Sequence, residues 1–198
     1  MRCLNEHIAR KANFEDHCTG HFWEGRFKSQ ALLDEQALLT CMAYVELNPI
    51  RAKMADTPET SEFTSIKQRI DDKKKEGGRP KKDSMSLEQS GLSLKEFLSK
   101  GDYLQDQIPF HYQDYLDLVD WSGRAIRSDK RGAIDPHLPP ILTRLGIDPE
   151  HWCKAMQPKG AHQFSRAMGC CDKLREYASK LEIRWIKGIN LSCKLFPT

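Results

Sequence analysis

The segment Asp34–Ala52, with the sequence DEQALLTCMAYVELNPIRA, decides the fold of the first part of the chain. Asp34 is the expected N-cap of a helix that begins at the next residue. Glu35 puts a negative charge in the first turn of this helix, where the helix dipole favours it. An apolar stripe follows at the spacing i, i+3, i+4 and i+7, formed by Leu38, Cys41, Met42 and Val45. We therefore expect an amphipathic helix whose stripe faces the core.

Pro49 stops or kinks this helix, because its ring removes a backbone donor and restricts the residue before it. Two roles for Asn48 follow. It caps a new turn that has Pro49 at its first position. Alternatively, it shares a helix face with Tyr44, four residues earlier, and shapes a site there.

Around this segment the patterns predict short elements and a linker. We expect a helix over 2–13, a strand over 27–32, a turn at 57–59 and a helix over 64–70. Residues 71–92 are charged, contain Gly and Pro, and have no apolar periodicity, which indicates a flexible or partly helical linker.

The remaining residues, 93–198, predict a helical module. Helices are expected over 112–127, over 139–145 with Gly146 as its end, from Asp148 with Pro149 at its first position, over 171–180 and around 190–195. Trp121, Trp152 and Trp185 are expected to anchor its core. The chain is thus divided into 1–70, a charged linker 71–92 and a basic helical domain 93–198.

Composition excludes several classes of protein. The chain has 198 residues, 39% hydrophobic and 30% charged, which is typical of a soluble protein. No apolar run approaches the roughly 18 residues of a membrane span, so we expect no membrane partner. The seven cysteines are odd in number and irregularly spaced, which predicts reduced thiols in a cytoplasmic protein.

Positive charge gathers towards the C-terminus. Residues 121–198 hold 14 Lys and Arg against 7 Asp and Glu, a net charge of +7, while residues 1–120 carry −4. Such a basic third suits nucleic acid. A solvated basic face with no partner would have the same composition.

Three features in a fixed order resemble one family. They are Trp23–Ser29 (WEGRFKS), the helix of the segment Asp34–Ala52, and the motif Tyr44–Ala52 (YVELNPIRA) followed by Thr57-Pro58-Glu59. This order resembles the C-terminal half of the catalytic domain of the single-tyrosine HUH transposases, which include REP-associated and insertion-sequence transposases. Residues 20–66 carry the resemblance. It implies an α/β ferredoxin-like domain, of which this chain holds the C-terminal part, followed by a helical C-terminal domain. As it stands, the chain is expected to be mainly α with a small residual β element.

The resemblance also implies a chemistry. In the family the helix tyrosine attacks a phosphodiester of single-stranded DNA and forms a 5′-phosphotyrosine link, and the matching residue here is Tyr44. A tyrosine hydroxyl has a pKa of about 10 and needs help to act as a nucleophile. Without the motif, Tyr44 would be interpreted as an ordinary residue at the edge of a core.

Five further residues are candidates for contact with DNA. Arg26, Lys28 and Arg51 are expected to bind phosphate, Trp23 to stack on an unpaired base, and Asn48 to shape the site. The alternatives are solvated surface charges and a core tryptophan. The expected partner is single-stranded or hairpin DNA.

The metal site of the family is missing. Family members hold a divalent ion, Mg²⁺ or Mn²⁺, with two histidines separated by one apolar residue. None of the seven histidines of this sequence forms such a triplet, so we expect no metal ligands from this chain and no activity of the chain alone. Three explanations of the absent histidine pair stay open. The gene is truncated, its start lies further upstream, or a second chain supplies the half of the domain that holds the histidines. A sheet that lacks its first strands exposes an edge, which predicts self-association as a homodimer.

Three functions therefore stay open from the sequence. The chain is a strand-transfer enzyme that needs an upstream segment, a non-catalytic DNA-binding module derived from a transposase, or a remnant with no present function.

Overall fold

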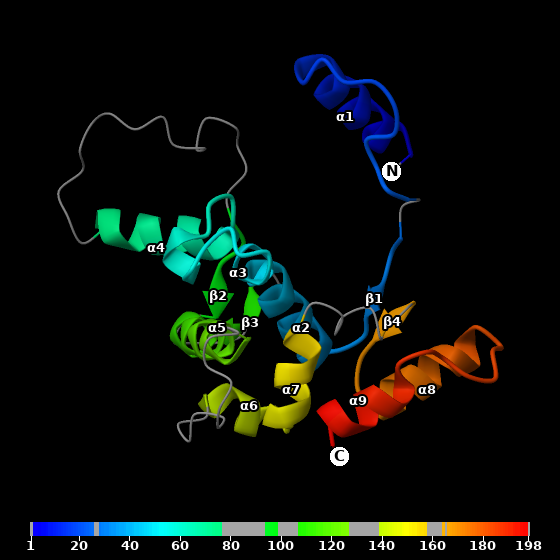
Figure 1. Cartoon of the computed structure of the whole chain (residues 1–198). Helices are drawn as coiled ribbons and strands as arrows, with labels where there is room; N and C mark the ends of the chain where they lie inside the picture. The colour runs from blue at the N-terminus through cyan, green and yellow to red at the C-terminus, as the bar shows by residue number, and fades with distance from the viewer. Residues whose placement is uncertain are drawn as a thin grey trace. The chain divides into compact units, whose positions relative to one another are not determined.

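The computed structural model describes residues 2–25, 28–76, 94–98, 107–126, 139–157, 164 and 166–197. The chain forms two compact units, Met1–Ala31 and Leu32–Thr198, which are described separately. The described residues are mainly helical with a few short strands (Figure 1), which confirms the predicted mainly-α class. Among these residues, no helix has the length and apolar character needed to cross a membrane.

The first unit consists of one helix and the loop that follows it. Helix α1 (Arg2–Glu15) confirms the helix predicted over 2–13 and extends it by two residues. The loop turns back through the Asn13 side chain, which donates to the Gly20 carbonyl at 3.1 Å. Gly20 has a φ of 113°, a backbone conformation that glycine adopts without strain.

Helix α2 (Glu35–Glu46) opens the second unit. Its predicted cap is confirmed, because the Asp34 carboxylate accepts a hydrogen bond of 2.8 Å from the Ala37 N–H. Of the predicted apolar stripe, Leu38 and Met42 are half-buried and pack against the core, Cys41 is half-buried, and Val45 is exposed. The buried face is the neighbouring row, formed by Ala37, Leu39, Thr40, Ala43 and Glu46.

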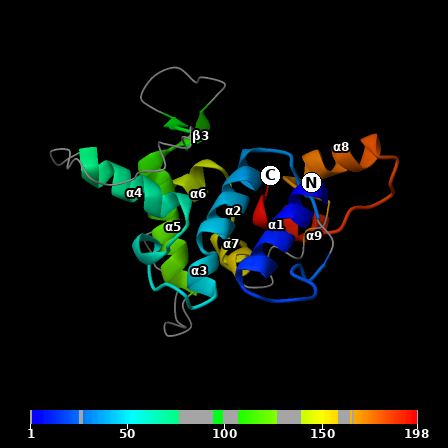
Figure 2. The ribbon, with the colours of Figure 1, turned by 90° about the horizontal axis from the view of Figure 1, so that it is seen from above.

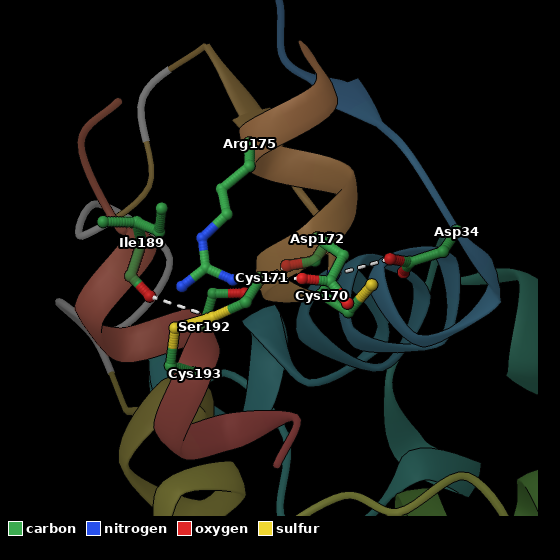
Figure 3. The surroundings of a disulfide bond; sticks show 9 residues. Asp34, Cys170, Cys171, Asp172, Arg175, Ile189, Ser192 and Cys193 are labelled. Atoms are coloured by element: carbon green, nitrogen blue, oxygen red, sulfur yellow. Dashed lines mark hydrogen bonds and ion pairs between the residues drawn. A yellow bond between two sulfur atoms is a disulfide. The ribbon is translucent and has the colours of Figure 1, made fainter. Parts of the chain in front are cut away.

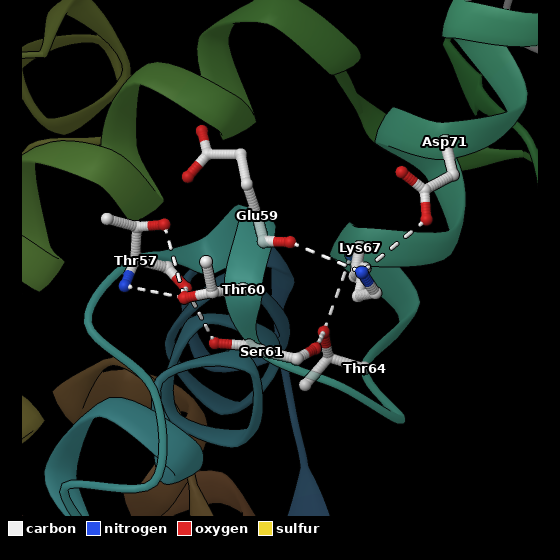
Figure 4. A network of polar contacts seen from close by, with 7 residues as sticks. All are labelled: Thr57, Glu59, Thr60, Ser61, Thr64, Lys67 and Asp71. Carbon is white, nitrogen blue, oxygen red and sulfur yellow. Dashed lines mark hydrogen bonds and ion pairs between the residues drawn. The ribbon is translucent and has the colours of Figure 1, made fainter.

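The segment after α2 changes direction twice. Helix α3 (Asn48–Arg51) is followed by a 3-10 turn, η1 (Pro58–Thr60), and by α4 (Ser65–Glu76). Figure 4 shows the hydrogen bonds that fix this stretch: the Ser61 hydroxyl donates to the Thr57 carbonyl at 2.9 Å, and Thr64 donates to Ser61 at 2.7 Å. The turn at 57–59 is therefore confirmed.

Helix α4 is longer than the helix predicted over 64–70. It continues through residues 71–76, which the sequence assigned to the linker, and Lys67 forms an ion pair with Asp71 across one turn at 3.7 Å. The rest of the predicted linker, residues 77–92, lies outside the described residues.

The strands are short and occur in pairs. Strand β2 (Phe97–Leu98) runs parallel to β3 (Ile108–His111). Strand β1 (Ala31–Leu32) pairs with β4 (Ala167–Met168), and the Leu33 N–H donates to the Met168 carbonyl at 3.0 Å. The strand predicted over 27–32 is thus present only in its last two residues; Phe27 lies outside the described residues.

The helices predicted for the last part of the chain are confirmed. They are α5 (Tyr112–Ile126), α6 (Pro140–Arg144), α7 (Pro149–Met156), α8 (Cys171–Lys180) and α9 (Ile189–Leu195). Asp148 caps α7 by accepting a 2.8 Å hydrogen bond from the His151 N–H, as expected. Gly146, with a φ of 61°, follows α6.

A single core joins the two halves of the Leu32–Thr198 unit. Helix α2 contacts both α5 and α7, and the three helices lie side by side in Figures 1 and 2. Buried residues of the first half, such as Leu39 and Ile66, and of the second half, such as Phe97, Trp152 and Phe196, belong to one cluster. By compactness the chain divides after Ala31. The division into 1–70, 71–92 and 93–198 stays a prediction.

The three tryptophans expected in this core have different positions. Trp121 and Trp152 are buried, and the Trp152 indole donates to the Ser122 hydroxyl at 2.8 Å. The prediction for Trp185 is wrong, because 73% of its surface is exposed in the loop between α8 and α9. The apolar residue buried in that loop is its neighbour Ile186.

A disulfide joins Cys171, the first residue of α8, to Cys193 in α9 (Figure 3). The prediction that all thiols are reduced is therefore wrong for this pair, while Cys3, Cys18, Cys41, Cys153 and Cys170 are free. Sequence spacing missed the pair because the two cysteines, 22 residues apart, meet only when α8 and α9 pack on each other.

Candidate functional site

Tyr44, Asn48 and Arg51 lie together where α2 passes into α3. Tyr44 is in the last turn of α2, and Asn48 begins α3 with Pro49 as the next residue. The helical phase of α3 turns Arg51 back towards α2, so its guanidinium lies over the Tyr44 ring, 3.6 Å from the ring centroid. This distance is well within the range of a cation–π contact.

The Arg51 guanidinium holds three parts of the chain. It donates to the Tyr44 carbonyl at 2.6 Å, to the Asn48 side-chain oxygen, and to the Met156 carbonyl at the end of α7 at 3.3 Å. The last carbonyls of a helix have no partner within the helix, so a cation that donates to them stabilises the helix ends. Burial lowers the pKa of Arg51, while the charge of Tyr44 and a side-chain hydrogen bond with it raise that pKa.

Tyr44 is half-buried and packs against the edge of the core. One face of its ring carries the Arg51 cation. The side chain therefore has a restricted orientation and retains some access to solvent, which suits either a boundary residue or a reactive group at the surface.

Asn48 does not cap the new turn. The residue that precedes α3 is Leu47, and it offers no side-chain cap. The Asn48 side chain instead accepts a hydrogen bond from Arg51. Of the two roles expected from the sequence, the capping role is wrong, and the observed contact is a positioning of Arg51 beside Tyr44.

The other predicted DNA contacts belong to the first unit. The Trp23 indole donates to the Asn5 carbonyl at 2.9 Å, and its ring makes an edge contact with Phe22 at 4.8 Å between centroids. Trp23 is therefore tied to α1 and is neither fully buried nor free. Lys28 is exposed, and Arg26 lies outside the described residues.

Sequence reasoning missed one polar residue close to this site. Glu46, two residues after Tyr44, is buried, and its carboxylate accepts hydrogen bonds from the Ser65 hydroxyl and from the Ile66 N–H at 3.2 Å. A carboxylate at the N-terminus of α4 is stabilised by the helix dipole. The signal was present, since Glu46 lies on the same helical row as Leu39 and Ala43.

The described residues include no group that could hold the metal that the resemblance implies. In the described part of the chain, no three His, Cys, Asp or Glu side chains come together in a way that could hold a metal ion. The sequence has no His-apolar-His triplet either. We therefore assign no metal ligand to the residues of this sequence.

Comparison of the chain with protein-family models, with curated proteins and with solved structures finds no match.

Proposed function

We propose that this chain is the tyrosine-bearing part of a single-tyrosine HUH transposase and acts on single-stranded or hairpin DNA. The proposal rests first on the ordered motifs Trp23–Ser29 and Tyr44–Ala52. The observation that carries it is the Arg51 guanidinium 3.6 Å above the Tyr44 ring. A fixed positive charge beside a phenol attracts a phosphodiester to the hydroxyl, and it favours the negative charge that develops during attack.

In the proposed step, the Tyr44 hydroxyl oxygen attacks a backbone phosphorus of the DNA. The bond from the tyrosine oxygen to phosphorus forms as the bond from phosphorus to the 3′ oxygen breaks. The phenol proton passes to solvent, and the released 3′ oxygen takes up a proton. The DNA is left with a 3′ hydroxyl and a 5′-phosphotyrosine, and reversal of the same exchange rejoins a strand.

Each residue of the site has a role in this proposal. Tyr44 is the nucleophile, Arg51 orients its ring and supplies the charge, and Asn48 positions Arg51 through its side-chain oxygen. Trp23, Arg26 and Lys28 are proposed to contact the DNA strand. The intact domain is proposed to be ferredoxin-like, and the protein to be cytoplasmic.

The histidine pair of the family is proposed to come from residues outside this sequence. Because this chain has no such triplet, we expect it to cleave no DNA by itself. Self-association as a homodimer is part of the same proposal, and sedimentation velocity of the purified chain tests it.

The test is a covalent adduct. A labelled hairpin oligonucleotide is incubated with Mn²⁺ and either this chain or its fusion to the histidine-bearing half of an intact transposase of the class. We expect a denaturant-resistant adduct from the fusion, and its loss in Tyr44→Phe. Tyr177→Phe is the matched control, since Tyr177 is also half-buried on a helix and should not affect the adduct. No adduct from any fusion would contradict the proposal.

A second candidate function is non-catalytic binding of DNA. The net charge of +7 on residues 121–198 favours it. The affinity should then fall steeply with salt and should be the same in Tyr44→Phe. Absence of binding to hairpin or duplex DNA at low salt would exclude this function.

A further inference from the structure

The loop between α8 and α9, residues Leu181–Gly188, holds an exposed tryptophan on a fixed backbone. Trp185 is 73% exposed, whereas the next residue, Ile186, is 3% exposed and anchors the loop in the core. At the start of the loop, the Glu182 N–H donates to Ser179 at 3.0 Å and the Ile183 N–H donates to Ala178 at 3.1 Å. At its end, Gly188 has a φ of 100° and begins α9. The backbone therefore holds the Trp185 indole outward.

Two cations flank this tryptophan. Arg184 and Lys187 are both exposed, and neither forms an ion pair with any of the described residues. The cations of the adjacent helix α8 differ, because each has a carboxylate partner: Lys173 and Lys180 pair with Glu176 at 3.3 and 2.8 Å, and Arg175 pairs with Asp172 at 3.0 Å. Within the described residues, the loop thus carries two exposed cations without a carboxylate partner, one before and one after Trp185 in the sequence.

The two helices that carry the loop are joined at their opposite ends. The Cys171–Cys193 disulfide links them, the Ser192 hydroxyl donates to the Gly169 carbonyl, and the Cys170 N–H donates to Asp34 at 2.6 Å (Figure 3). This bracing joins the two helices at the ends away from the loop. A loop carried on joined helices loses less entropy when it binds a ligand.

An exposed indole with two exposed cations in the same loop matches a partner that is flat, apolar and anionic. Single-stranded nucleic acid has all three properties, since its unstacked bases have exposed faces and its phosphates carry charge. A neutral apolar protein surface would leave Arg184 and Lys187 without partners. Charge complementarity therefore favours nucleic acid.

We propose that the loop Leu181–Gly188 is a binding site for single-stranded nucleic acid, in which Trp185 stacks on an unpaired base and Arg184 and Lys187 contact the adjacent phosphates. The inference deepens the proposed function, and it rests on that function only for the choice of DNA as the nucleic acid. Tyr44 takes no part in this site.

The stacking is tested with the full chain and a fluorescein-labelled oligonucleotide of twelve thymidines, by fluorescence anisotropy at low salt. Base stacking is worth about 1–3 kcal/mol, so Trp185→Ala should weaken binding about 5-fold to 150-fold. Trp185→Phe should retain most of the affinity, while Trp185→Leu should bind as poorly as the alanine variant. Phe63→Ala is the matched control, because Phe63 is a fully exposed aromatic residue elsewhere in the same unit. All the replaced side chains are exposed, so thermal unfolding should be unchanged.

The charge contribution is tested by salt dependence. Each phosphate contact to a single strand contributes about 0.7 to the slope of log affinity against log salt. Arg184→Ala combined with Lys187→Ala should therefore lower the slope by about 1.4. Lys67→Ala, which removes a half-buried cation already paired with Asp71, should leave the slope unchanged.

Three results would overturn the inference. They are no binding of the oligonucleotide by the wild-type chain, equal binding by Trp185→Ala, and wild-type affinity in Trp185→Leu, which would indicate an apolar docking site instead. Failure here is distinct from failure of the proposed function, because the covalent adduct depends on Tyr44 and is measured on a hairpin substrate. Equal binding by Trp185→Ala would leave the adduct prediction intact, and a missing adduct would leave the Trp185 result intact.

Discussion

The guanidinium of Arg51 lies 3.6 Å above the ring of Tyr44 and donates a 2.6 Å hydrogen bond to the carbonyl of the same residue. The same guanidinium also donates a hydrogen bond to the Met156 carbonyl, at the end of α7. Arg51 therefore connects α2, α3 and α7 while it fixes the orientation of Tyr44. A residue expected from the sequence to bind phosphate is thus engaged in holding the site together.

Replacement of Arg51 should destabilise the protein. Arg51→Ala removes the hydrogen bonds that Arg51 donates to two backbone carbonyls and to the Asn48 side chain. We therefore expect a loss of about 1–3 kcal/mol in the free energy of unfolding. Arg51→Lys should lose less, since lysine retains the charge but not the planar fork. Chemical denaturation measures both variants.

The matched control for Arg51 is Arg124→Ala. Arg124 forms an exposed ion pair with Asp120, one helical turn away, at 2.7 Å. Such pairs contribute little, so this variant should lie within about 0.5 kcal/mol of the wild type. Equal stability of Arg51→Ala and Arg124→Ala would show that the contacts of Arg51 contribute no stability.

The disulfide should be visible in a thiol count. The chain has seven cysteines, of which five are free in the structure. Denatured, unreduced protein should therefore react with five equivalents of a thiol reagent, and reduced protein with seven. A count of seven without reductant would contradict the structure and agree with the expectation from the sequence.

Loss of the disulfide should also lower stability. In the chain-entropy model, a loop of this length, closed by cysteines 22 residues apart, is worth about 3 kcal/mol. Cys193→Ala should therefore lower the melting temperature, and reductant should have no further effect on it. Cys3→Ala, at an exposed free cysteine, is the control and should melt as the wild type does.

Local signals in the sequence predicted where the helices begin and end, but they did not predict which faces of the helices pack against one another. The cap at Asp34 and the helix bounds from Tyr112 onward depend on neighbouring residues, which the sequence displays directly. The buried face of α2 depends on which helices pack against it, and two adjacent apolar rows, Leu38 with Met42 and Leu39 with Ala43, competed for that role.

The same limit applies to the candidate site. The spacing of Tyr44, Asn48 and Arg51 brought them to one helix junction, as a sequence pattern can show. The bond from Arg51 to Met156 spans 105 residues, and the pairing of Cys171 with Cys193 requires two packed helices. No short-range pattern contains that information.

Gly169 should not tolerate a side chain. A Cβ built there would lie 2.9 Å from both the Asp34 carboxylate and the Leu33 Cβ, closer than such atoms can approach. Gly169→Ala would disturb the contact between Asp34 and the Cys170 N–H, and we expect a loss of about 1–3 kcal/mol in unfolding free energy. Gly25→Ala, where no atom lies within 4 Å of the added Cβ, should be neutral. If Gly169→Ala and Gly25→Ala have the same free energy of unfolding, the atoms around Gly169 do not lie as close as the structure has them.

Asp148 should make part of the stability depend on pH. Desolvation raises its pKa, but hydrogen bonds from the His151 N–H, at 2.8 Å, and from the His151 ring, at 2.7 Å, outweigh that effect, and the pKa is lowered. A carboxyl whose folded pKa is lowered stabilises the protein above its unfolded pKa, about 3.9, and that stabilisation is lost as the pH falls through the folded value.

Asp148→Asn keeps a side-chain oxygen for the cap but lacks the charge. The variant should therefore be less stable than the wild type at pH 7, and the gap should close as the pH falls below about 4, through the lowered pKa of Asp148. Urea denaturation across this range measures the gap, with Asp172→Asn, in the first turn of α8, as the control. A gap that does not shrink as the pH falls below about 4 would show that the charge of Asp148 does not contribute to the cap of α7.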